Sequence, residues 1–80
     1  MKNQNLIFIK GPTTNLYYAF GLFAQLTNAG WKTELNPEAP IMVLNPNDKT
    51  IYTTKDNIID AIELITENQV EEVLKLAGVL

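Results

Sequence analysis

The first apolar run along the chain is Leu6-Ile7-Phe8-Ile9, and it ends at the turn-forming residues Lys10-Gly11-Pro12. Apolar residues follow one another in this run instead of alternating with polar ones. An uninterrupted run of this length is typical of a strand that is buried on both faces. We therefore expect a central strand at residues 6–9.

A helix is predicted from Asn15 to Ala29, because apolar residues recur there every three or four positions. Gly30 is a typical residue just beyond a helix end, and Thr13 or Thr14 would cap the start. The face expected to pack on the core comprises Leu16, Ala19, Phe20, Phe23, Leu26 and Thr27.

Three further strands are expected between residues 31 and 53. Residues Trp31–Leu35 alternate with a period of two, and Trp31 is expected in the core or at its edge. The runs Ile41–Leu44 and Thr50–Thr53 flank Asn45-Pro46-Asn47-Asp48, whose residue types favour a turn. These two runs are therefore predicted to pair as a hairpin.

The C-terminal part of the chain predicts two helices. Thr54 would cap the first, from Lys55 to about Ile65. Thr66 and Gln69 have the spacing of a capping box, which marks the start of the second helix, and Gly78 marks its end. The apolar stripe of this helix comprises Val70, Val73, Leu74 and Ala77. One helix of over twenty residues is the alternative.

The order β-α-β-β-β-α-α predicts an α+β fold in a single domain, residues 1–80. In this fold a small, mostly antiparallel sheet of three or four strands is packed by helices. A right-handed crossover through the first helix would instead leave the first two strands parallel. Eighty residues form a small core, so an oligomer contact is expected to add buried surface.

The residue inventory disfavours several chemistries, because the chain has no histidine, cysteine, serine or arginine. The usual general base and the best nucleophile are missing, so we expect no enzyme activity. We also expect no cofactor and no metal site. The lack of arginine disfavours direct nucleic-acid binding. The apolar run near the start is too short for a signal peptide or a membrane span, which predicts a cytoplasmic location away from membranes.

Acidic residues concentrate in the second half of the chain. Residues 1–40 carry three lysines and two glutamates, whereas residues 41–80 carry three lysines and seven acidic residues. Side chains three or four positions apart would form one acidic helix face, made of Asp56, Asp60, Glu63 and Glu67. Glu71 and Glu72 extend this face if the two helices run on as one. This face is a candidate surface for a partner protein that is basic or binds nucleic acid. A solvated face that keeps the protein soluble is the simpler interpretation.

The first helix offers a candidate self-association surface at Tyr17, Tyr18, Gly21 and Leu22. Its apolar residues surround the helix more widely than a small core can cover, and tyrosine is a common interface anchor. The alternative is a helix enclosed within the fold.

The turn before the first helix is a candidate anion site. Lys10, Thr13 and Thr14 would hold the anion at the helix N-terminus. The spacing differs from that of a P-loop, and a turn followed by a helix cap is the simpler interpretation.

The sequence thus predicts a small non-catalytic protein-interaction module, with a homodimer as one possible form. A small acidic protein of this kind fits a viral or mobile-element inhibitor that blocks a host or defence protein in an anti-CRISPR-like role. The alternatives are a sensor of a small ligand or anion that uses the Lys10–Thr14 loop, and a structural subunit of an assembly.

Overall fold

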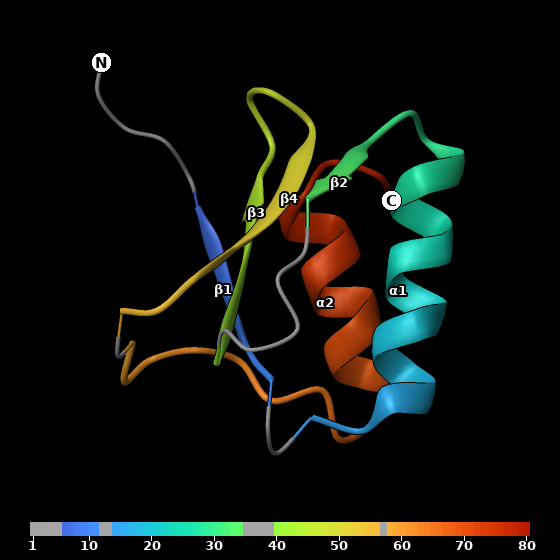
Figure 1. The fold of residues 1–80 in the computed structure, drawn as a ribbon. Helices are drawn as coiled ribbons and strands as arrows, with labels where there is room; N and C mark the ends of the chain where they lie inside the picture. Colours follow the sequence, from blue (N-terminus) through green and yellow to red (C-terminus); the bar gives the residue numbers. More distant parts are fainter. Residues whose placement is uncertain (1–5, 12–13, 35–39, 57) are drawn as a thin grey trace.

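A computed structural model describes residues 6–11, 14–34, 40–56 and 58–80 of the chain. Its elements are, in order, β1 (Ile7–Lys10), α1 (Leu16–Asn28), β2 (Lys32–Glu34), β3 (Ile41–Asn45), β4 (Thr50–Thr54) and α2 (Glu67–Leu76). The two helices lie side by side against one face of a four-stranded sheet (Figure 1). The predicted α+β fold is therefore confirmed. In the part of the chain that is described, no helix is long and apolar enough to cross a membrane.

The strand order in the sheet is β1-β3-β4-β2. β1 pairs antiparallel with β3, β3 pairs antiparallel with β4, and β4 pairs parallel with β2. The sheet is therefore mixed, whereas the sequence predicted a mostly antiparallel one. β1 and β2 lie at opposite ends of this order, so the expectation of a central first strand is wrong and the first two strands are not neighbours.

The predicted hairpin is confirmed as β3 and β4, whose last pair is Asn45 with Thr50. The buried Asn45 side chain organises the turn between them. Its Oδ1 accepts a hydrogen bond of 3.0 Å from the Asn47 N–H, and its Nδ2 donates one of 3.3 Å to Asp48 Oδ2. Asparagine commonly stabilises turns by binding the backbone two residues further on, which explains a polar residue at a buried strand end.

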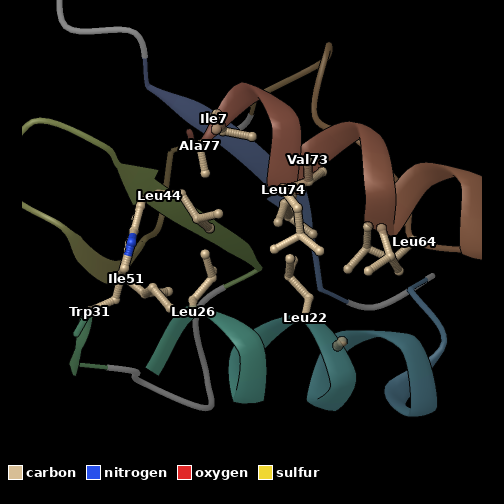
Figure 2. Close-up of a cluster of buried hydrophobic side chains, with 13 residues drawn as sticks. Ile7, Leu22, Leu26, Trp31, Leu44, Ile51, Leu64, Val73, Leu74 and Ala77 are labelled. Carbon is tan, nitrogen blue, oxygen red and sulfur yellow. The ribbon is translucent and has the colours of Figure 1, made fainter. Parts of the chain in front are cut away.

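Successive side chains of a strand point to opposite faces of the sheet, and here each face has its own cluster. The larger cluster joins the sheet to both helices, with Leu22 of α1 directed toward Leu74 of α2 and Leu26 directed toward Leu44 of β3 (Figure 2). Its sheet residues include Ile7, Ile9, Leu44 and Ile51. The smaller cluster comprises the buried Ile41, Val43 and Ala61, with Leu6, Phe8, Tyr52 and Ile58 packed against them.

The start of α1 differs from the prediction, and its end agrees. The N-cap is Asn15, whose Oδ1 accepts a hydrogen bond of 2.9 Å from the Tyr17 N–H. Thr14 is not the cap, and Thr13 lies outside the described residues. At the other end Gly30 has a φ of 95°, and the Trp31 N–H donates to the Leu26 carbonyl at 3.0 Å. This is a Schellman motif, and it turns the buried Trp31 back onto the core, as predicted.

The core face of α1 lies one position away from the predicted stripe. Ala19, Leu22 and Leu26 are its buried residues, whereas Leu16 and Phe20 are 64% and 65% exposed. Thr27, also expected on this face, is exposed, and Phe23 is half-buried. Apolar residues occupy so much of the helix surface that their spacing alone does not fix which stripe meets the sheet.

The predicted helix at residues 55–65 is absent: the described residues of this segment, 55–56 and 58–65, are not helical. The Thr54 hydroxyl does accept a hydrogen bond of 3.2 Å from the Asp56 N–H, but a turn follows it. Further along, the Ile62 N–H donates to the Phe8 carbonyl, and the Lys10 N–H donates to the Ile62 carbonyl, both at 2.8 Å. Ile62 thus pairs with the outer edge of β1, whose backbone groups would otherwise lack partners.

The second predicted helix is confirmed as α2. Gln69 Oε1 accepts hydrogen bonds of 2.8 Å from the N–H groups of Ile65 and Thr66, which completes the predicted capping box. The buried stripe of α2 is Val70, Val73 and Leu74, with Ala77 at the C-cap. Gly78 follows with a φ of 80°, so the helix ends where the sequence predicted.

Candidate interaction surface

The outward face of α1 is apolar and exposed. Tyr17 is 78% exposed, and Leu16 and Phe20 lie beside it with about two thirds of their surface in solvent. The thirteen residues of α1 include no charged side chain. Large apolar and aromatic side chains that are exposed together are typical of the centre of a protein–protein interface. This helix face is therefore a candidate contact surface.

A groove of about 610 Å³ runs between α1 and α2 and continues this surface. Its lining is Tyr17, Tyr18, Phe20, Gly21, Gln25, Glu67, Val70, Glu71, Leu74 and Leu80. Val70 and Leu74 are buried and form its floor. The rings of Tyr17 and Tyr18 meet edge to face, with centroids 5.4 Å apart, at one end of the α1 side. We refer to these ten residues as the α1/α2 groove.

Gly21 lies near the middle of the α1 side of the groove. Apart from its chain neighbours and the nearby backbone of α1, a Cβ built on Gly21 would have no atom within 4 Å, and the φ of Gly21 is not in the left-handed region. Neither packing within the described chain nor backbone conformation therefore requires a glycine here. Glycine inside a helix is nevertheless unfavourable compared with alanine. The consequence of Gly21 is an open space above α1, next to two tyrosines.

The α2 side of the groove is acidic. Glu67 and Glu71 are exposed and lie one helical turn apart. Within the described ranges the ion pair found is between Lys10 and Glu63. Neither groove glutamate forms an ion pair there, although Lys75 lies one helical turn beyond Glu71. Glu67 also lies in the first turn of α2, where a negative charge is favourable to the helix dipole. Glu71 lies beyond that turn, so the dipole does not account for it.

The groove combines parts of two predicted surfaces. It brings Tyr17, Tyr18 and Gly21 of the expected self-association surface next to Glu67 and Glu71 of the expected acidic face. Leu22, the fourth residue of the self-association surface, is fully buried and faces the core instead. A core position on α1 cannot contact a second molecule, so this assignment of Leu22 is corrected.

The other acidic residues do not join Glu67 and Glu71 on one helix face, because the segment that holds them is not helical. Asp56 is exposed after β4, and Asp60 borders a second hollow beside β1. The Glu63 carboxylate lies 3.3 Å from the Lys10 ammonium. The predicted continuous acidic face is therefore wrong, and its groove part is the pair Glu67 and Glu71.

The residues predicted to bind an anion have partners within the chain. The Lys10 ammonium is paired with Glu63, and the buried Thr14 hydroxyl accepts a hydrogen bond of 3.1 Å from the Leu64 N–H. Thr13 lies outside the described residues. The structure thus gives no support to an anion site at this loop.

The sequence did not predict that Phe20 and Leu80 contribute to a binding surface. Phe20 was assigned to the core face of α1, and Leu80 was assigned no role. Val70 and Leu74 were expected to be buried, but not to form a groove floor. The exposure of Phe20 follows from the shifted stripe of α1, which no local pattern reveals. The pairing of α1 with α2 is a tertiary contact between segments about fifty residues apart.

Comparisons of the chain with protein-family models, with curated proteins and with solved structures find no match. In the described part of the chain, no three acidic side chains gather closely enough to hold a metal ion. The polar groups of the groove are two tyrosine hydroxyls, one amide and two carboxylates. These groups are suited to hydrogen bonding and charge pairing with another molecule.

Proposed function

We propose that this protein is a non-catalytic protein-interaction module whose contact surface is the outward face of α1 together with the α1/α2 groove. The observation that carries the proposal is the exposure of Leu16, Tyr17 and Phe20 on a helix without a charged residue. Isolated apolar residues on a surface are ordinary, but contiguous large ones beside a groove mark binding sites. Aromatic side chains such as Phe20 and Tyr17 are the usual anchors of such sites.

The residue inventory supports binding over catalysis. The groove is open and lined by aromatic and aliphatic side chains, and the chain offers no imidazole, thiol or serine hydroxyl to it. An inhibitor that blocks a host or defence protein is one form that such a module takes, and the small size and acidic composition fit it. A cytoplasmic location belongs to the same proposal, on the sequence grounds given above.

A paired substitution tests the proposal. Phe20→Asp places a charge in the groove, and Ile59→Asp makes the same kind of change at an 84% exposed residue outside it. Tagged forms of both variants and of the unaltered protein are expressed in cells that naturally produce the protein, and the proteins retained with each are quantified. We expect Phe20→Asp to lose partners that Ile59→Asp keeps. Equal retention by the two variants, with circular dichroism unchanged, would refute the proposed surface.

A further inference from the structure

We propose that the α1/α2 groove accommodates an amphipathic helix of a partner protein that carries lysine or arginine beside its apolar stripe. This inference rests on the proposed function and adds the chemistry of the partner. The groove has a neutral, aromatic side on α1 and an acidic side on α2. The expected occupant has the reverse arrangement, with an apolar stripe toward α1 and cationic side chains toward α2.

The dimensions of the groove fit a helix. Along α1 the lining extends from Tyr17 to Gln25, which is about 12 Å of helix axis at 1.5 Å per residue. This length accepts about two turns of a third helix, which presents apolar side chains at positions i, i+3, i+4 and i+7. The two helices that form the groove already lie side by side (Figure 1), so a third helix can pack against both.

Gly21 gives the groove depth where the occupant would approach most closely. The absence of a side chain there allows another helix backbone to come near α1. Because nothing within the described chain fills the space above Gly21, the space is available to the occupant. The exposed rings of Tyr17 and Phe20 lie beside this space and would flank the incoming helix.

The charges favour a foreign basic helix over a second copy of this chain. A second copy inserting α1 into the groove would bring no cation, because α1 has no charged residue. Glu67 and Glu71 would then lose water without gaining a partner, which is unfavourable. In α2, the other described helix, Lys75 is the sole cation among four charged residues. Lysine or arginine beside the apolar stripe of a partner helix satisfies both groove carboxylates.

The test uses three synthetic helical peptides of about 18 residues, long enough to extend beyond both ends of the groove. The peptides share one leucine stripe and differ only in the residues beside it, which are lysine, glutamine or glutamate. Their affinities for the protein are measured by fluorescence anisotropy at low and high salt. We expect the lysine peptide to bind about tenfold more tightly than the glutamine peptide at low salt, with the glutamate peptide weakest.

Two charge-matched double variants locate the effect. Glu67→Gln with Glu71→Gln should weaken binding of the lysine peptide about three- to tenfold, since one exposed ion pair changes affinity by up to about fivefold. Asp56→Asn with Glu72→Gln removes the same net charge outside the groove and should leave the affinity unchanged. Equal affinities for the lysine and glutamine peptides, equal losses in the two double variants, or no binding of any peptide would overturn the inference.

Failure of this inference is separable from failure of the proposed function. If no peptide binds while Phe20→Asp still loses partners in the capture experiment, the surface stands and the basic helix is rejected. Sedimentation of the protein alone gives the remaining outcome. A dimer that Phe20→Asp dissociates would identify a second copy as the occupant and would overturn the basic helix.

Discussion

The hydroxyl of Thr14 accepts a hydrogen bond of 3.1 Å from the backbone N–H of Leu64, fifty residues further along the chain. The neighbouring Asn15 N–H donates to the Leu64 carbonyl at 2.9 Å. These two bonds join the start of α1 to the segment that leads into α2. Together with the buried cluster shared by the two helices, they hold the start of α1 beside the start of α2, where the α1/α2 groove lies.

Removing the Thr14 hydroxyl should destabilise the fold. Thr14→Val keeps the shape of the side chain but leaves the buried Leu64 N–H without its acceptor. We expect the free energy of unfolding to fall by about 1–3 kcal/mol, measured by urea denaturation. Thr33→Val makes the same change at an exposed position of β2 and should alter stability by less than about 0.5 kcal/mol. Equal effects of the two substitutions would argue against a structural role for the Thr14–Leu64 bond.

The corrected core face of α1 makes opposite predictions for two neighbouring residues. Leu22 is fully buried, so Leu22→Ala should cost about 2–5 kcal/mol of unfolding free energy. Phe20 is mostly exposed, so Phe20→Ala should cost less than about 1 kcal/mol. Thermal or chemical denaturation followed by circular dichroism measures both. A larger fall in unfolding free energy from Phe20→Ala than from Leu22→Ala would support the core face of α1 that the sequence alone predicted.

Gly21 should limit the stability of the isolated protein. Gly21→Ala adds a Cβ that meets no neighbour, so the helix should gain about 1 kcal/mol and the melting temperature should rise by about 4–8 °C. If the groove binds a helix, the same substitution should also weaken binding of the lysine peptide to the protein. Gly30→Ala is the matched control, because its φ of 95° strains alanine and should destabilise by at least about 1 kcal/mol. A destabilised Gly21→Ala variant would contradict the open space above this residue.

Amide hydrogen exchange distinguishes the observed pairing of Ile62 with β1 from the helix that the sequence predicted. The N–H groups of Lys10 and Ile62 are bonded between β1 and this segment, so both should exchange slowly and at similar rates. In a helix ending at Ile65, the Ile62 N–H would be bonded within the segment and the Lys10 N–H would lack this partner. Fast exchange at Lys10 with slow exchange at Ile62 would support that helix.

The sequence predicts those elements whose signals are local. The capping box at Thr66 and Gln69, the turn after Asn45 and the glycine after each helix are interactions between residues a few positions apart. For this reason α2, the hairpin and the C-terminal ends of both helices agree with prediction. The isoleucine spacing at residues 58–65 also suits a helix, yet Ile62 satisfies the edge of β1, more than fifty residues away. Hydrogen bonding to the β1 edge therefore outweighs the helical spacing of these isoleucines, because β-branched residues favour a helix only weakly.

In the candidate site, too, local features were predictable from the sequence and tertiary contacts were not. Tyr17, Tyr18 and Gly21 were recognised because they lie off the apolar stripe expected to face the core. Glu67 and Glu71 were recognised as the end of an acidic face that begins at Asp56, and the rest of that face is not formed. The meeting of the tyrosines and these glutamates in one groove required the packing of α1 on α2. The assignments of Phe20 to the core and Leu22 to the surface were reversed, because a helix that is apolar on most sides does not reveal which stripe is buried.

Site-specific photocrosslinking in cells that produce the protein tests the contact surface most directly. A benzophenone amino acid replaces Tyr17, Phe20 or the exposed Ile59 in turn, and the covalent adducts formed on illumination are resolved by mass. Adducts from positions 17 and 20 that are absent from position 59 are expected if the outward face of α1 meets the partner. An adduct of twice the 9.0 kDa chain would identify a second copy. Adducts from position 59 alone, or none from positions 17 and 20, would contradict the assignment of this surface.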